Sequence, residues 1–576
     1  MKLKQIASLI AASAITMSAQ GVARDSLWVM DMVHHNPMDE PFKSAFCQPS
    51  KLASLGMNAI VINEFKFPHC AVTFDSLDKN ICPPGSDERR WAEALANEIN
   101  SRIEECHKNG LEALFFTDII VLPKRLVELY RDDICDEQGN ISFKQPFTWT
   151  VHKMMLDELF ELFPEMDGLV IRTGETYTHN IPYHCGNGPV DYKNDYDGSI
   201  DVHAGLLNLL REEVCVKRRK KVVYRTWDFG YFHTRPEYYM AVTSQVAPHP
   251  GLYLSVKHTQ GDYFRTFPFN KTLTLGNHKQ LVEVQCQREY EGKGAYPNYI
   301  AEAVINGFEE TQGDPAPRCL NDIKDHPLYA GIWTWSRGGG WYGPYLQNEL
   351  WCDLNAYVLS QWGHNPQRSE AEIFEEYSTA IGITPDTRPH FRRMCLLTPD
   401  AIIRGRGSLI HDVSVTWTRD HYLGGEKQLQ RAFRDIYERN IVDEALAEMK
   451  QSTAIWEEID SLARLVKCAD TATESYIRTS ARYGLLLHRI MRDGFAIMLK
   501  GYIGDRTGNY DVAFIKAAID SYDRAWSDYR WLKEENSDCA TLYHDRYVTF
   551  NAGGVRNKIE FADGMGAGVD KYRNMF

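Results

Sequence analysis

Residues 167–179, "DGLVIRTGETYTH", contain the clearest fold signal in the sequence. Leu169 to Ile171 form a short, continuous apolar run, which ends abruptly in Arg172, Gly174 and Glu175. An apolar run of this length, bounded by glycine and charge, predicts a buried strand. Strands that are apolar on both faces belong to parallel sheets covered by helices. The two charges are therefore expected at the end of a strand, at the edge of a sheet.

Runs of the same kind recur through the first 360 residues, with helix-period segments such as 87–110, 147–164 and 201–214 between them. Strands that alternate with helices predict a parallel sheet. Eight such strands match a closed (β/α)8 TIM barrel better than an open sheet. The predicted strands are 27–33, 58–63, 112–117, 168–173, 221–227, 252–258, 281–287 and 329–335.

From about residue 376 the pattern changes, because strand-like runs stop and long amphipathic patterns follow at 427–466, 470–501 and 510–534. We therefore predict an α/β chain with a catalytic barrel at 25–375 and an all-helical domain at 376–576. The helical domain is expected to offer the surface of a homodimer.

Residues 1–24 have the pattern of a signal peptide. Lys2 and Lys4 give a basic start, an apolar run follows, and Val22 and Ala23 end it on small residues. The apolar run is too short to span a bilayer, and no other stretch approaches a membrane span. The sequence predicts an exported protein, periplasmic or secreted.

The net charge of −14 disfavours nucleic acid as a partner, and the basic cluster at 217–221 reads as a solvated helix end. The 13 cysteines are scattered without a C-x-x-C pair, which favours buried free thiols over a zinc or redox site. A calcium loop at 191–198 fails on spacing, because Lys193 stands at a ligand position. Nucleotide, zinc-protease and esterase motifs are missing, so no metal and no cofactor is expected.

Charged and aromatic residues collect at the predicted strand ends, where TIM barrels place their chemistry. Pairs of carboxylates, with tryptophan rings beside them for the sugar to pack on, are typical of glycoside hydrolase active sites. A single acidic residue at a strand end is more commonly part of an ion pair than catalytic. The prediction of a glycosidase site therefore depends on three acids lying at one barrel mouth. The acids are Glu175, Asp262 and Glu289, the cations are Arg172, Arg225 and Lys257, and the tryptophans include Trp227 and Trp335.

Several segments resemble the family 67 glycoside hydrolases, α-glucuronidases that release uronic acid from xylan side chains. No fragment is decisive alone, and the specificity lies in their order and spacing. The segments are "PSKLASLGMNAIVINEF" (49–65), "GLVIRTGE" (168–175), "VDYKNDYDGSIDVHAGLLNLL" (190–210), "LSVKHTQGDYF" (254–264), "QLVEVQCQREYEG" (280–292) and "WYGPYLQNELWCDLNAYVLSQWGHNP" (341–366).

The resemblance implies that Glu175 is the general acid and that Asp262 and Glu289 activate water. It also implies inversion of configuration, which requires acid and base about 6.5–9.5 Å apart. Basic residues at corresponding strand ends of the family hold the sugar's C6 carboxylate. The expected substrate-binding residues are Arg172, Arg225, Lys257, Trp227, Trp335, Trp341 and His34.

Three departures from the family concern substrate choice. The barrel is expected to begin almost at the mature N-terminus, without the family's usual β-rich domain, and Thr173 and Gly174 differ from the family's residues. The segment "MVHHNPMDEPF" (32–42) has no counterpart in the family, so His34 and His35 there either line the pocket or have a structural role. In addition, Arg172 aligns only with a one-residue deletion. The expected function is release of a terminal uronic acid from an acidic oligosaccharide or polysaccharide. Two alternatives stay open: a glycosidase for a neutral sugar or galacturonic acid, and a carbohydrate-binding protein without catalysis.

Overall fold

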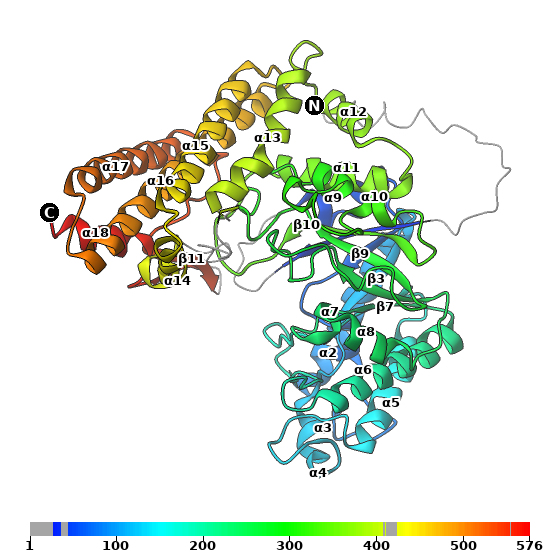
Figure 1. Cartoon of the computed structure of the whole chain (residues 1–576). Coiled ribbons are helices and arrows are strands. Elements are labelled where there is room, and N and C mark those ends of the chain that lie inside the picture. The colour runs from blue at the N-terminus through cyan, green and yellow to red at the C-terminus, as the bar shows by residue number, and fades with distance from the viewer. Residues whose placement is uncertain (1–26, 36–43, 407–408, 411–422, 553–554) are drawn as a thin grey trace.

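The computed structural model describes residues 27–35, 44–406, 409–410, 423–552 and 555–576 (Figure 1). The predicted signal peptide at 1–24 lies outside these residues. Within the described part of the chain, no helix is both long enough and apolar enough to cross a membrane. All 13 cysteines are free thiols.

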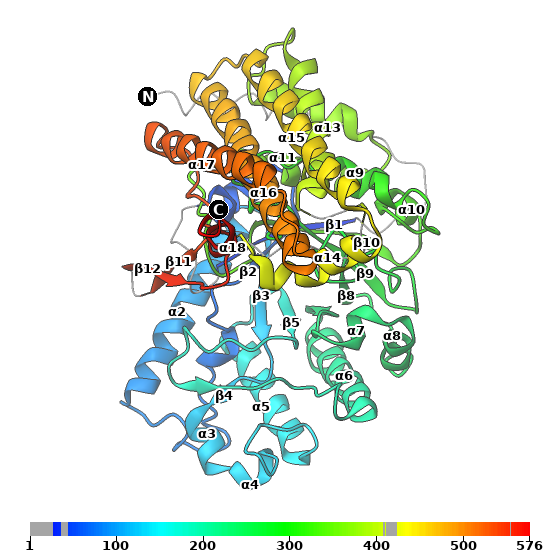
Figure 2. The ribbon, with the colours of Figure 1, turned by 60° about the vertical axis from the view of Figure 1, so that its left-hand side comes forward.

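Eight parallel strands close into a barrel in the order β1-β10-β9-β8-β7-β5-β3-β2 (Figure 2). Each predicted strand is present, and the predicted TIM barrel is confirmed. The strands are β1 (Trp28–His34), β2 (Ala59–Ile62), β3 (Glu112–Asp118), β5 (Gly168–Arg172), β7 (Lys221–Arg225), β8 (Leu252–Lys257), β9 (Lys279–Gln285) and β10 (Tyr329–Gly338).

The apolar run of β5 is continuous because the two faces of the strand meet different cores. Val170 belongs to the cluster inside the barrel, which also contains Met30 and Trp333. Leu169 and Ile171 belong to the larger cluster between the barrel and its helices. Successive side chains point to opposite faces of a strand, so burial on both faces requires every position to be apolar.

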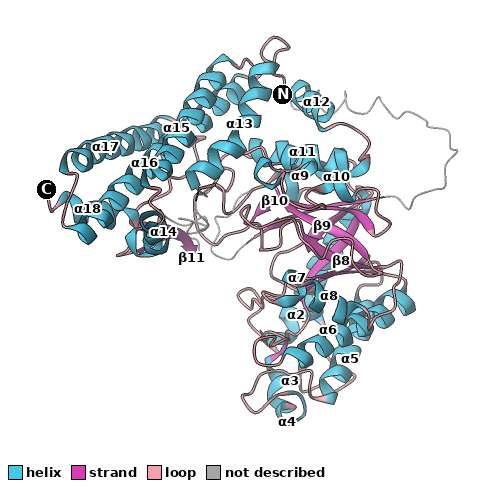
Figure 3. Cartoon of the chain, in the orientation of Figure 1, coloured by secondary structure: helices cyan, strands magenta, loops and turns pink. Residues whose placement is uncertain are grey.

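Helices surround the strands (Figure 3). Ser86 caps α2, because its side chain accepts a hydrogen bond from the backbone N–H of Arg89. The helices of this part are α1 (Pro49–Ser54), α2 (Asp87–Lys108), α3 (Lys124–Leu129), α4 (Arg131–Ile134), α5 (Pro146–Leu162), α6 (Tyr196–Leu210), α7 (Tyr231–Thr234), α8 (Pro236–Thr243), α9 (Ala301–Asn306), α10 (Leu320–Ile323) and α11 (Leu350–His364). The short strands β4 (Leu122–Pro123) and β6 (His184–Cys185) pair outside the barrel.

The rest of the chain is mainly helical, as predicted, and the predicted domain boundary at 375/376 falls inside α12. The segment 427–466 forms two helices, since Asn440 between them has a φ of 56°. An antiparallel pair, β11 (Tyr547–Ala552) and β12 (Val555–Glu560), adds to the expected helices. The helices are α12 (Glu370–Ala380), α13 (Arg388–Arg406), α14 (Glu426–Glu438), α15 (Val442–Leu465), α16 (Thr471–Thr507), α17 (Val512–Glu535) and α18 (Met565–Arg573).

Candidate active site

A hollow opens at the carboxyl ends of β1, β5, β7, β8, β9 and β10. Its empty space, open mouth included, is about 390 Å³, but only about 30 Å³ is wide enough for the centre of a water molecule. A sugar ring therefore enters only if side chains at the mouth turn aside. The lining residues are His34, Glu175, Tyr177, Arg225, Trp227, Phe229, Lys257, Asp262, Glu289, Trp335, Gly339, Gly340 and Trp341.

The hollow brings together the three predicted acids, Glu175, Asp262 and Glu289. It also contains every residue predicted to bind substrate except Arg172. The acids come from the ends of three different strands, β5, β8 and β9, which explains why residues more than 100 positions apart can face one space.

Arg172 is buried beneath the hollow. Its Nε and Nη2 atoms each donate to a carboxylate oxygen of Asp118, both at 2.5 Å. Its remaining nitrogen, Nη1, lies 3.5 Å from Oε2 of Glu175, whose side chain is 23% exposed. Arg172 therefore contacts the predicted acid from below, in place of the predicted contact with substrate.

Arg225 lines the hollow and is held in place by Glu283. Its Nε and Nη2 donate to the two carboxylate oxygens of Glu283 at 2.9 and 2.8 Å. Burial favours the neutral form of Glu283, but the Arg225 guanidinium and its hydrogen bonds outweigh burial and hold the pKa of Glu283 below its ordinary value. We find no acceptor for Nη1 of Arg225 among the described residues, so this atom is free to meet a ligand.

Asp262 is held at both carboxylate oxygens. Nζ of Lys257 donates to Oδ1, and the hydroxyl of Tyr290 donates to Oδ2. The backbone of Asp262 has a φ of 54°, which residues other than glycine rarely adopt and which is enriched at functional sites. Nζ of Lys257 also lies 4.0 Å from the ring centre of Trp227, a cation–π contact that fixes the ammonium at the wall of the hollow.

Glu289 is positioned by Gln285 at the end of β9. The Gln285 side chain accepts from the backbone N–H of Glu289 at 2.8 Å and donates to its Oε1 at 3.2 Å. Gly339, in the segment after β10, has a φ of 94°, and a Cβ there would lie 2.3 Å from Nε2 of Gln285 and 3.1 Å from Cδ of Glu289. Only glycine permits this approach.

His34 forms a neutral part of the wall. Its ring stacks on Trp335 with a centroid distance of 5.3 Å. Burial, followed by the positive charges of Arg172 and Arg225, holds the pKa of His34 well below its ordinary value. The imidazole therefore offers an uncharged hydrogen-bonding group at neutral pH. No cluster of three or more His, Cys, Asp or Glu side chains suited to a metal ion occurs in the described part of the chain.

Several functional positions were not predicted from the sequence. Tyr177 and Phe229 line the hollow, and Tyr290 binds Asp262. Tyr177 and Phe229 each follow a charged residue at a strand end by a few positions, and this spacing could have identified them as lining residues. The run of three glycines at 338–340 before Trp341 is a second signal, since such a run permits a close backbone approach.

Comparisons with known proteins bear on the fold. No family model and no curated protein matches this chain. Among solved structures, a GH138 enzyme targeting pectin rhamnogalacturonan II is similar with a TM-score of 0.55 and 11% identity, over 91% of this chain and 63% of that one. A mutant O-GlcNAc hydrolase from Thermobaculum terrenum aligns with a TM-score of 0.39 and 10% identity, over 96% of this chain and 93% of that one. This chain thus spans less than two thirds of the GH138 protein, and the shared feature is the fold.

Proposed function

We propose that this chain is an exo-acting glycoside hydrolase. One observation carries the proposal: Glu175, Asp262 and Glu289 line a single hollow at the C-terminal mouth of a closed barrel, together with three tryptophans. Carboxylates supply the acid and the base of glycoside cleavage, and tryptophan packs against the C–H face of a sugar ring. The similar GH138 structure is described as an enzyme that targets a pectic polysaccharide, which is consistent with this use of the fold.

In the proposed reaction, Glu175 donates a proton to the departing glycosidic oxygen and becomes a carboxylate. Nη1 of Arg172, at 3.5 Å, stabilises that new negative charge. Asp262 or Glu289 removes a proton from a water molecule, and the water oxygen bonds to the anomeric carbon while the glycosidic bond breaks. Attack by water from the face opposite the leaving group inverts the configuration.

We propose a terminal uronic acid as the sugar, in the manner of an α-glucuronidase. Arg225 and Lys257 line the hollow, and Nη1 of Arg225 is available for a carboxylate of the substrate. A guanidinium binds carboxylates more strongly than neutral hydroxyls, because the hydrogen bonds are charge-assisted. The proposed place of action is outside the cytoplasm, on fragments of an acidic polysaccharide.

A neutral sugar is the second candidate, and a specific observation favours it. Glu283 already pairs with Arg225, and Asp262 already pairs with Lys257. Both cations can therefore serve to balance the acids of the site. The two candidates differ in a measurable way, since only a uronidase needs a cation for its substrate.

The test is a screen of the full chain against glucuronoxylan oligosaccharides, rhamnogalacturonan fragments and neutral aryl α-glycosides. Release of a free uronic acid by the wild type, and its loss in Glu175→Gln, supports the uronidase. Release of neutral sugar alone supports the second candidate. Absence of any released sugar across the panel refutes the hydrolase proposal. Proton NMR of the first-formed anomer then decides between inversion and retention.

A further inference from the structure

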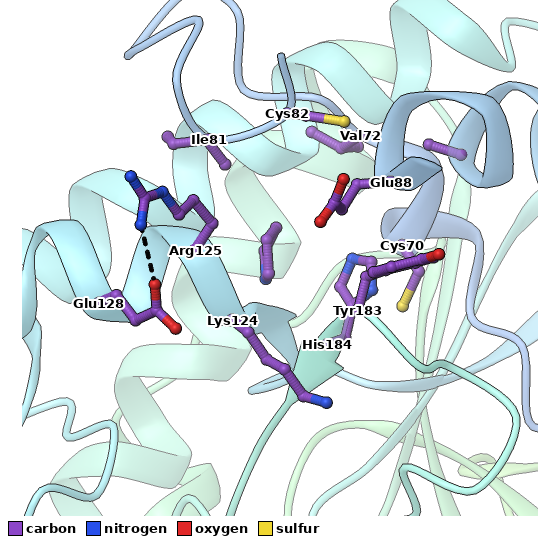
Figure 4. Close-up of a pocket in the computed structure, with 12 residues that line it drawn as sticks. Cys70, Val72, Ile81, Cys82, Glu88, Lys124, Arg125, Glu128, Tyr183 and His184 are labelled. Carbon is purple, nitrogen blue, oxygen red and sulfur yellow. Dashed lines mark hydrogen bonds and ion pairs between the residues drawn. The ribbon is translucent and has the colours of Figure 1, made fainter. Parts of the chain in front are cut away.

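A second cavity lies outside the hollow, between the loops that follow β2, β3 and β5 and the first turns of α2 (Figure 4). It contains about 930 Å³ of empty space with its mouth included, and about 410 Å³ admits the centre of a water molecule. This is the size of pockets that bind small molecules. Part of its wall is apolar, made by Val72, Ile81, Ala92 and Pro123.

His184 supplies an unusual polar group to this cavity. Its side chain is buried, and neither ring nitrogen has a hydrogen-bond partner within the described residues. Burial lowers the pKa of His184 to about 3, so the ring is neutral and offers one N–H donor and one acceptor. Each nitrogen exposes less than 1 Å², so both lie just beneath the cavity wall, and a ligand reaches them when the ring turns. Buried polar atoms are normally paired, and two unpaired nitrogens at a cavity wall point to a ligand that both accepts and donates.

The charged side chains in the cavity wall differ in whether they have an ion-pair partner. Nζ of Lys124 donates to the carbonyl oxygen of Pro182 at 2.7 Å, and Arg125 pairs with Glu128 at 3.1 Å. Glu88, on the first turn of α2, makes no hydrogen bond or ion pair with any described residue. Figure 4 shows the Glu88 carboxylate facing the cavity, apart from the Arg125–Glu128 pair. Among the described residues, Glu88 and Lys124 are thus the wall charges without an ion pair, and they are opposite in sign.

We propose that this cavity is a second, non-catalytic carbohydrate site, which binds a neutral sugar unit. Sugar hydroxyls both donate and accept, as the neutral His184 ring, the Tyr183 hydroxyl and the Glu88 carboxylate require. The apolar wall accommodates the C–H face of the ring. A ligand of either charge gains little, because the Glu88 carboxylate and the Lys124 ammonium have no ion-pair partner among the described residues and act on it with opposite signs.

The test is isothermal titration calorimetry of the full chain with methyl glycosides of galactose, glucose, xylose, arabinose and rhamnose. We expect at least one to bind the wild type. His184→Phe keeps a ring of similar shape and loses both nitrogens, and it should weaken binding at least tenfold. Glu88→Gln, at a partly exposed position where the carboxylate has no ion pair with a described residue, should weaken binding at least fivefold. Glu128→Gln is the matched control, since Glu128 is already paired, and it should stay within twofold.

Absence of binding by the whole panel overturns the proposal. Binding that survives both His184→Phe and Glu88→Gln but is lost in Trp341→Ala also overturns it, because the sugar then occupies the catalytic hollow. Tighter binding of inorganic phosphate or methylamine at this cavity refutes the sugar class. If His184→Phe lowers the melting temperature, Glu88→Gln alone decides. The titration involves no turnover, so its result is separate from that of the hydrolysis screen.

Discussion

At the scale of single residues, the site contains arginine–carboxylate pairs that differ in how many guanidinium nitrogens the carboxylates occupy. Arg172 is fully committed below the hollow, with two nitrogens on Asp118 and the third beside Glu175. Arg225 gives two nitrogens to Glu283 and keeps one at the hollow. The two arginines therefore differ in what surrounds their third nitrogen, which is a carboxylate of the protein for Arg172 and the hollow for Arg225.

Glu175→Gln is the first prediction. Glutamine keeps the shape of the side chain but has no proton to donate at neutral pH, so kcat should fall by about 10²–10⁴-fold. KM should change little, because the substrate contacts remain. Steady-state kinetics on the best substrate of the screen checks this. An unchanged kcat would remove Glu175 from the acid role.

Lys257→Met is the second prediction, and it separates the two sugar classes. Methionine keeps the apolar stem over Trp227 and removes the charge. For a uronide, the variant should lose about 2–4 kcal/mol of transition-state binding, seen as a fall in kcat/KM, because the bound carboxylate of the substrate loses a charged partner. The loss of the Asp262 pair affects every substrate, so the quantity to measure is the ratio of kcat/KM for a uronide and its neutral counterpart. A ratio equal to that of the wild type contradicts carboxylate recognition by Lys257.

Asp31→Asn is the third prediction, and it concerns pH. Asp31 is buried in β1 and accepts hydrogen bonds from Thr334 and Ser336. Burial raises the pKa of Asp31 to about 6. The folded protein thus holds this proton more tightly than the unfolded chain does. Protonated Asp31 therefore contributes about 3 kcal/mol to the free energy of unfolding below about pH 4, and this contribution is lost as the pH rises through 6.

In Asp31→Asn this loss should disappear, because the amide does not titrate. Urea unfolding at pH 4, 5, 6 and 7 measures it: the wild-type free energy of unfolding should decline over this range relative to that of the variant. Parallel pH curves for the two proteins would show that Asp31 titrates normally.

At the scale of elements, the strands were predictable and their cross-strand partners were not. A continuous apolar run identifies a strand buried on both faces, as in β5. The pairing of Asp118 with Arg172 depends on the register between β3 and β5, where these two residues are opposite each other. Register follows from how the closed barrel staggers its strands, which one linear sequence does not contain. The sequence therefore showed which charges stand at strand ends, but not which of them neutralise one another.

The C-terminal elements were also predicted only in part. The amphipathic pattern across 427–466 continues through Asn440, so the break between α14 and α15 was missed, although asparagine tolerates the left-handed conformation found there. The pair β11 and β12 was also missed. Their sequences flank Gly553 and Gly554, and a Gly-Gly pair between two short alternating runs is a known hairpin signal.

Gly339→Ala is the fourth prediction. The added methyl would collide with Gln285, and the residue would be held at a φ of 94°. We expect a loss of stability of about 1–3 kcal/mol, from strain and displaced side chains, and at least a tenfold fall in kcat as Gln285 releases Glu289. Gly508→Ala is the matched control, since its φ is 73° with nothing within 4 Å of the new Cβ. It should lose about 1 kcal/mol of stability and keep full activity, and equal activity loss in both variants would contradict the argument.

At the scale of the whole molecule, the C-terminal helices contact the loops that carry the acids (Figures 1 and 2). Thr398 of α13 accepts from the backbone N–H of Tyr299, and Arg406 donates to the hydroxyl of Tyr296 at 2.9 Å. The segment after β10, which includes Trp341, is tied to β11 by a hydrogen bond from the backbone N–H of Gly343 to Thr549. The helical part therefore supports the site from outside the barrel.

Arg265 is the most direct of these links and the subject of the fifth prediction. It follows Asp262 by three residues, binds Glu310 at 2.5 and 2.9 Å, and donates to the carbonyl oxygen of Pro399 in α13. Arg265→Met keeps the length of the side chain but leaves two acceptors unpaired, so stability should fall by about 2–4 kcal/mol. Because Asp262 sits in a strained backbone conformation, its carboxylate should lose position, and kcat should fall at least tenfold.

Arg393→Met is the control that isolates this link. Arg393 lies on α13 itself, but its pair with Glu458 is exposed, and exposed pairs contribute about 0–1 kcal/mol. Its kcat and melting temperature should stay close to those of the wild type. If Arg265→Met loses stability but keeps kcat, the helices stabilise the barrel without positioning Asp262. If both parameters stay at wild-type values, the contact between α13 and the Asp262 loop has no functional role, and catalysis depends on the barrel alone.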